Sequence, residues 1–260
     1  MNTPLVVLSD APLTLLPPHS AYIVFVLIQY GLAAFVAFIL AKTFELKNTR
    51  LIITAVVASP APFLVGFFGQ IGAYVFLAFV IALWAGKKNY AMLTGVAIAC
   101  TLIKPQLGIC IAVALPWGAP WRTWLGFGLT GLALLGVTVI MLSPSGAIAY
   151  VHALQMFQHS NFATHSPDSL GLTSLYYGWA SSAMSIFLKI SLGIIMVVAL
   201  VLLAIRYKYR PTSQACAAVI YILVLVTSYS HQYDAIALLP CLWMARLPHG
   251  KVMNAVAVIG

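Results

Sequence analysis

The sequence predicts an all-α protein, a polytopic bundle of transmembrane helices. Hydrophobic residues make up 63% of its 260 residues and charged residues only 7%, far outside the range of soluble globular domains. The apolar residues form long runs and do not alternate with polar residues over segments of about ten, as the strands of membrane barrels do. Helices satisfy their own backbone hydrogen bonds in lipid, so they are the expected element.

About nine apolar segments are expected in the membrane. They cover residues 21–41, 51–68, 70–86, 90–103, 105–117, 123–143, 183–205, 213–229 and 231–246. A helix needs about 20 apolar residues to cross a bilayer. The segments 90–103 and 105–117 are shorter, since each supplies only roughly 20 Å of helix at about 1.5 Å per residue. They predict a short helix pair over 90–117 that turns within the membrane.

The basic residues orient this bundle. If successive segments reverse direction, eleven of the thirteen Lys and Arg residues share one side, which the positive-inside rule assigns to the cytoplasm. They are Lys42, Lys47, Arg50, Lys87, Lys88, Arg122, Arg206, Lys208, Arg210, Arg246 and Lys251. The net charge of +9 is therefore explained by the orientation of the helices in the membrane and does not indicate binding of nucleic acid. Lys104 and Lys189 fall on the outer side.

No soluble domain interrupts the chain, so residues 1–260 are expected to form a single, incomplete transmembrane domain. The longest hydrophilic connection, 144–181, falls on the outer side and contains apolar and aromatic positions, among them Tyr150 and Trp179. Loops of this length are usually functional or disordered. We expect short interfacial helices there, which form a lid over the outer face.

Lys104 is the strongest candidate for a functional residue. Pro105 lacks an N–H and disfavours helix at the residue before it, so the turn of the short helix pair falls at these two residues. Non-helical backbone at that depth is tolerated where protein buries it or water reaches it, and an intramembrane lysine indicates function. One interpretation is an anion-binding lysine in an outward-facing cavity. The alternative is a lysine that snorkels to the outer headgroups.

Two other outer turns carry polar residues. Gln70 lies among Gly66, Gly69 and Gly72, where the backbone can turn tightly or be approached by a ligand. His231 and Asp234 lie three residues apart at the outer mouth of a helix, hence on one face. Each is as readily explained as a turn or cap residue as by function. Their convergence with Lys104 on one side strengthens the functional interpretation.

The four cysteines, Cys100, Cys110, Cys216 and Cys241, lie in apolar runs without the spacing of a metal site, so their expected role is packing. Neither a metal-ligand cluster nor a nucleotide-binding glycine-rich loop is evident.

In their order along the chain, three stretches resemble glycosyltransferase family 87 of the GT-C superfamily. Residues 5–25 resemble a family segment with the pattern "PL..LP...A". Residues 69–108, which end in "KPQLG", resemble the family's glutamine-containing outer turn and its "KP" segment. Residues 227–240, "TSYSHQYDAIALLP", resemble its "YD" signature. The resemblance covers most of the chain.

The resemblance implies an inverting hexosyltransferase of the plasma or inner cell membrane. It would transfer a mannose-like sugar from a polyprenyl-phosphate donor to a lipid or glycan acceptor on the periplasmic or extracellular face. Lys104 and His231 are candidates to bind the departing phosphate, while Gln70, Tyr233 and Asp234 would orient sugar hydroxyls or hold His231. No cofactor is expected, although some members of the superfamily use a divalent cation.

The resemblance also implies a first helix and an outer loop that carries the general base, upstream of Met1. Residues 1–20 are neither a basic signal nor a full span, and the apolar run after Lys251 is only about nine residues long. We therefore expect a fragment with no known catalytic base and little activity alone. Two alternatives remain: a transporter or flippase with a broken helix pair, and an inactive truncated relic of the transferase.

Overall fold

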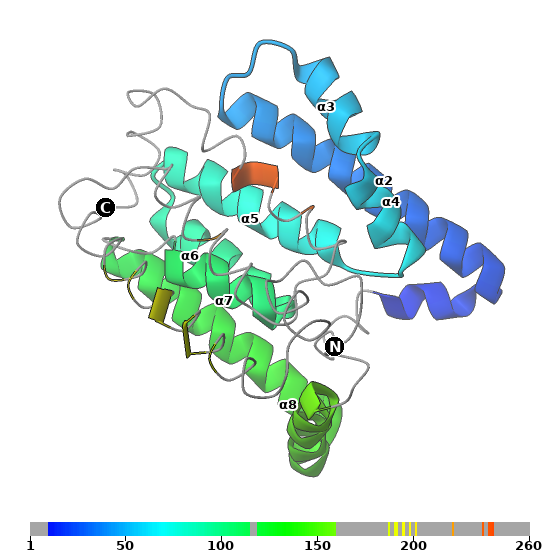
Figure 1. The fold of residues 1–260 in the computed structure, drawn as a ribbon, viewed down its shortest axis with the longest axis vertical. Coiled ribbons are helices and arrows are strands. Elements are labelled where there is room, and N and C mark those ends of the chain that lie inside the picture. Colours follow the sequence, from blue (N-terminus) through cyan, green and yellow to red (C-terminus); the bar gives the residue numbers. More distant parts are fainter. Residues whose placement is uncertain are drawn as a thin grey trace.

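The computed structural model describes residues 10–114 and 119–159, together with twelve single positions between 187 and 241. Within these residues the regular elements are all helices, which confirms the all-α prediction (Figure 1). In order they are η1 Ala11–Leu15, α2 Pro18–Thr43, α3 Thr49–Val57, α4 Pro60–Phe67, α5 Gly72–Lys87, α6 Ala91–Cys100, η2 Thr101–Ile103, α7 Pro105–Ala114 and α8 Trp121–His159.

Two helices in this part of the chain are long and apolar enough to cross a membrane, α2 and the first 23 residues of α8, Trp121–Ser143. The bent pair of α3 and α4 makes a third if it acts as one span. Gly72–Lys87 and Ala91–Ile103 are apolar but shorter. The last three segments expected from the sequence lie largely outside the described residues, so the number of about nine stays a prediction.

The segment 51–68 is not the single continuous helix that its apolar run suggested. It divides into α3 and α4, which are bent by 42°. Pro60 and Pro62 lack the N–H groups that would continue the α3 ladder, and Ser59, just before Pro60, takes an extended conformation with φ −70° and ψ 155°. Hydropathy locates the segment, but the prolines decide where its helix ends.

The turn between α4 and α5 is tight because Gly69 adopts a φ of +60°. Its N–H donates to the carbonyl of Gly66 at 3.1 Å, and the Gln70 N–H donates to the carbonyl of Val65 at 2.8 Å. This is the Schellman arrangement, in which the residue after the helix takes the left-handed conformation. The turn reverses the direction of the chain after α4, and α5 then lies alongside α2.

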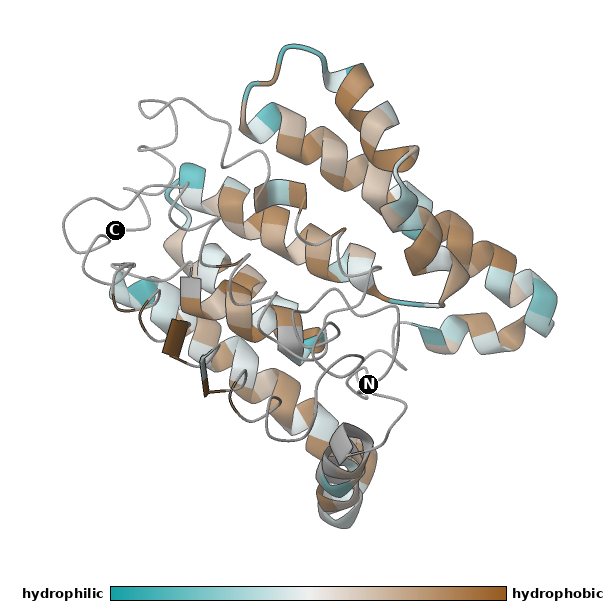
Figure 2. Cartoon of the chain, in the orientation of Figure 1, coloured by the Kyte–Doolittle hydropathy of each residue, from teal (hydrophilic) through white to brown (hydrophobic). Residues whose placement is uncertain are grey.

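Helix α5 lies between two groups of helices, with α2, α3 and α4 on one side and α6, α7 and α8 on the other (Figure 1). Buried side chains of α2, α3, α4 and α5 meet, together with Ile236, in an apolar cluster. Its members are Ala33, Val36, Ala37, Leu40, Val56, Ala61, Val65, Phe76, Val80 and Ile236. Hydrophilic residues gather at the ends of the helices and apolar residues along their lengths (Figure 2). This distribution suits an environment of hydrocarbon between two polar layers.

Helices α6 and α8 approach each other at glycines. A Cβ atom added to Gly95 would overlap the carbonyl oxygen of Thr123 and crowd the nitrogen of Phe127, and one added to Gly126 would overlap the carbonyl oxygen of Met92. Small residues permit this backbone contact between membrane helices.

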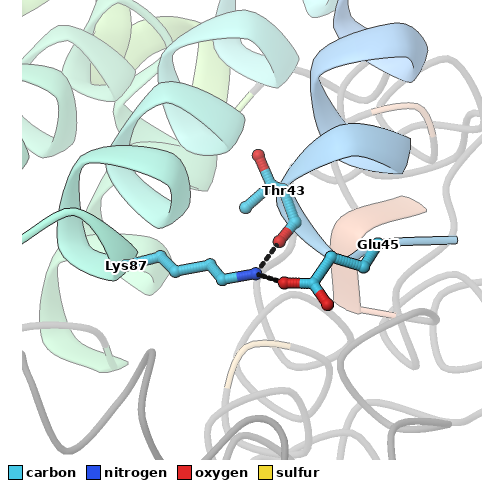
Figure 3. A network of polar contacts seen from close by, with 3 residues as sticks. All are labelled: Thr43, Glu45 and Lys87. Carbon is cyan, nitrogen blue, oxygen red and sulfur yellow. Dashed lines mark hydrogen bonds and ion pairs between the residues drawn. The ribbon is translucent and has the colours of Figure 1, made fainter.

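A polar clasp joins the C-terminal ends of α2 and α5 (Figure 3). The Lys87 Nζ donates to the carbonyl oxygen of Thr43 at 2.5 Å and to the Glu45 Oε1 at 2.8 Å. Its positive charge therefore lies against a carbonyl group at the end of α2, where the helix dipole is negative. The contact fixes the ends of both helices on the same side of the bundle.

Replacing Lys87 by methionine is expected to lower the free energy of unfolding by about 0.5–1.5 kcal/mol, because one charge-assisted hydrogen bond to a helix carbonyl is lost. Glu45→Gln should cost less, since the carboxylate is largely exposed and its ion pair is screened by solvent. Thermal unfolding in detergent measures both. Lys88→Met, at an exposed neighbouring position, is the matched control. Equal losses for Lys87→Met and Lys88→Met would contradict the role of the clasp.

Candidate functional site

The short helix pair reverses at Lys104, as the sequence predicts. Helix α6 continues into the 3-10 turn η2, and α7 begins at Pro105. Lys104, with φ −118° and ψ 88°, leaves the helical conformation at the turn. Its N–H donates to the Thr101 carbonyl at 3.1 Å, and its carbonyl accepts the N–H groups of Leu107 and Gly108 at 3.0 and 2.9 Å. Both sides of the Lys104 backbone are thus held by hydrogen bonds.

The Lys104 side chain is enclosed by protein. It is only 1% exposed and ranks among the largest fully buried side chains of the described residues. A lysine that snorkels to the headgroups would have to reach the surface, so this burial argues against the snorkelling alternative. The Lys104 side chain is also less exposed than a lysine in an open, water-filled cavity would be. An enclosed ammonium group requires an anionic or hydrogen-bonding partner to offset its desolvation.

Thr101 stabilises the same turn. Its side chain is fully buried, and its Oγ1 donates to the Ile98 carbonyl at 2.6 Å. Its own carbonyl accepts the Lys104 N–H. The hydroxyl therefore satisfies a carbonyl at the end of α6 while the backbone satisfies the turn.

Gln70 lies on the turn before α5 and is partly exposed. Its Nε2 donates to the Phe68 carbonyl at 3.3 Å. Because α5 and α6 are consecutive and joined by a tight turn, the start of α5 and the end of α6 lie at the same end of the bundle (Figure 1). Gln70 and Lys104 thus share an end, and η2 packs against α5.

The other three predicted site residues, His231, Tyr233 and Asp234, lie outside the described residues. Ile236, two positions after Asp234, is fully buried in the apolar cluster with Phe76 and Val80 of α5. Leu239 packs against the same cluster.

A profile of glycosyltransferase family 87 matches residues 1–228, most of the chain. The chain belongs to glycosyltransferase family 87. This confirms the resemblance found in the sequence. Membership in the family, together with the apolar helices, assigns the protein to the glycosyltransferases associated with membranes, which require a sugar donor and an acceptor. Neither the curated proteins nor the solved structures compared with the chain contain a match.

In this member of glycosyltransferase family 87, the sequence interpretation missed a buried glutamine, Gln29 of α2. Its side chain is fully buried, and neither atom of its amide has a hydrogen-bond partner within the structure described here. Unpaired amides in such surroundings cost free energy, so intramembrane polar residues are usually retained for a reason. The detectable signal was a glutamine in the middle of the apolar run 21–41.

Within residues 10–114, 119–159 and the described single positions, no group of three or more His, Cys, Asp or Glu residues lies close enough together to hold a metal ion. Beyond the span of α8, the backbone breaks at Ser143, before Pro144, and residues up to His159 are helical. This is the part of the predicted lid, 144–181, that the structure describes. Burial raises the pKa of the Tyr150 hydroxyl there above its ordinary value.

Proposed function

We propose that the protein transfers a mannose-like hexose from a polyprenyl-phosphate donor to a lipid or glycan acceptor, with inversion at the anomeric carbon. The observation that supports this most is the position of Lys104 at the turn between η2 and α7 in a family 87 chain. A lipid-linked phosphate enters from the bilayer, so it can bring an anion to that depth. A donor linked to a soluble nucleotide would have to reach the turn through water.

In the proposed reaction, the acceptor oxygen forms a bond to the anomeric carbon while the bond from that carbon to the donor phosphate oxygen breaks. The electron pair of the broken bond stays on the polyprenyl phosphate, and the acceptor proton passes to a base outside the residues proposed here. Because the leaving phosphate gains negative charge, a fixed ammonium near it stabilises the transition state more than the ground state. Lys104 is proposed for that role.

The remaining candidates are proposed to complete the same site. His231 would be a second donor to the phosphate, and Gln70, Tyr233 and Asp234 would orient sugar hydroxyls or hold His231. Gln70 directly precedes the start of α5, and Lys104 directly follows η2, which packs against α5. Ile236 lies buried against α5, the helix that also packs against η2. Both observations support a grouping of these residues around the start of α5.

The proposed site is on the outer face of the plasma or inner cell membrane. The clasp puts the ends of α2 and α5 on one side, and α6 starts there and rises roughly 20 Å over 13 residues before it reaches Lys104. The basic residues at the clasp end favour the cytoplasm. Lys104 would then lie toward the periplasmic or extracellular side of a multi-pass protein with about nine membrane segments.

Reporter fusions test this orientation. Fusions after Arg50, Lys88, Arg122 and Arg210 are all expected to report a cytoplasmic location, since each follows a segment that ends on the basic side. A fusion after Lys104 should report the opposite side. A periplasmic signal from any of the first four would break the alternation and put the proposed site on the wrong face.

Donor binding tests the function itself. The purified chain in nanodiscs is expected to bind polyprenyl-phosphate-mannose and not guanosine diphosphate mannose. Membranes that contain the chain, supplied with the radiolabelled lipid donor, report any transfer to lipid or glycan. Failure to bind the lipid donor, or tighter binding of the nucleotide donor, would contradict the proposal.

A further inference from the structure

We propose that Gly108 is a positioning residue for Lys104: its contact with the backbone of η2 sets where the ammonium lies relative to the donor phosphate. This inference rests on the proposed function, because it assumes that Lys104 binds that phosphate. It concerns a different residue, with its own geometric evidence.

No side chain fits at Gly108 without movement of the backbone. A Cβ atom there would lie 2.5 Å from the carbonyl oxygen of Thr101 and 2.6 Å from the nitrogen of Leu102. Real Cβ atoms essentially never approach other atoms closer than 3.0 Å. Both obstructing atoms belong to the backbone, so rotation of a side chain cannot relieve the overlap. Helix α7 would have to move away from η2.

Lack of space for a side chain, and not backbone conformation, accounts for the glycine at position 108. Among the described glycines only Gly69 has a positive φ, whereas Gly108 lies within α7. Alanine is the better helix former at such a position. The close approach of α7 to η2 is therefore the structural reason for glycine here.

The contact between Gly108 and η2 involves the same backbone groups that hold Lys104. The Gly108 N–H donates to the Lys104 carbonyl at 2.9 Å, and the Lys104 N–H donates to the Thr101 carbonyl, the group that obstructs a Cβ at Gly108. A shift of α7 away from η2 therefore pulls apart the two groups that hold the Lys104 backbone. Since charge stabilisation depends on precise placement of the donor group, a small shift should weaken contact with the phosphate.

The matched control is Gly95 of α6. A Cβ at Gly95 is also blocked by backbone atoms, those of Thr123 and Phe127, but these belong to the α6–α8 contact and not to the Lys104 turn. Gly95→Ala and Gly108→Ala should both reduce stability. Of these two variants, only Gly108→Ala should change the affinity of the protein for a phosphate group.

The measurement is the ratio of affinities for undecaprenyl phosphate and for undecaprenol, in nanodiscs, below the unfolding temperature of each variant. Gly108→Ala is expected to lower this ratio about fivefold or more, with undecaprenol binding unchanged, whereas Gly95→Ala leaves the ratio at the wild-type value. Pro105→Ala adds no Cβ at Gly108 but frees the backbone of Lys104, so it should also lower the ratio. This variant keeps the test valid if Gly108→Ala fails to fold.

Lys104→Gln separates the two proposals. If it lowers the ratio but Gly108→Ala and Pro105→Ala do not, the positioning role of the turn is wrong and the phosphate role of Lys104 stands. If the ratio is unchanged in Lys104→Gln as well, the phosphate role is wrong and the positioning role is overturned with it. A similar loss in Gly95→Ala would show a general loss of packing and would also overturn the inference.

Discussion

Replacing Lys104 by glutamine is expected to weaken binding of polyprenyl-phosphate-mannose about tenfold or more and to slow any sugar transfer by a similar factor. A charge-assisted hydrogen bond contributes roughly 1.5–3 kcal/mol, and the side chain is only 1% exposed, so solvent cannot replace it. Lys104→Arg should retain part of the affinity, because the charge survives while the geometry changes. Equilibrium binding in nanodiscs gives the first effect and transfer of radiolabelled sugar the second.

Lys88→Gln is the control for this experiment, since it removes an equal charge from an exposed position at the other end of α6. It should leave donor affinity unchanged. If Lys104→Gln also leaves both affinity and transfer unchanged, Lys104 is structural. The anion site would then have to be sought around His231.

Replacing Gly95 by alanine is expected to reduce the free energy of unfolding by about 1–3 kcal/mol, the usual cost of forcing extra atoms into a packed interface. The added methyl group meets the backbone of α8 at Thr123 and Phe127, so α6 and α8 have to separate. Gly131→Ala is the matched control on α8, because no described atom lies within 4 Å of a Cβ at that position. It should be neutral or slightly stabilising.

Thermal unfolding in a fixed detergent compares the two variants. A clear drop in Tm for Gly95→Ala, with no drop for Gly131→Ala, is the expected result. Equal Tm values would mean that α6 and α8 can separate without cost, and that the glycine contact does not hold this pair of helices together.

Some features of the fold could be predicted from short stretches of sequence, because the residues that cause them are neighbours in the chain. The expected segments 70–86 and 90–103 correspond closely to α5 and to α6 with η2, since apolar composition sets where a helix lies in a membrane. The reversal at Lys104 and Pro105 was predicted because proline acts on its own residue and the one before it. The break at Ser59 has the same local cause, in Pro60 and Pro62, but the continuous hydropathy of 51–68 concealed it.

The class of protein, the family and the position of the Lys104 turn can be predicted without coordinates, because composition, motif order and proline chemistry are properties of neighbouring residues. Three features follow instead from the packing of the helices: the Lys104 side chain is enclosed, Gln29 is buried without a partner in the structure described, and Gly95 and Gly108 lie against backbone. Each of these depends on which helix packs against which. Hydropathy does not predict which helices pack together. An apolar side chain gains no hydrophobic free energy by contacting another helix in place of lipid, because both are apolar.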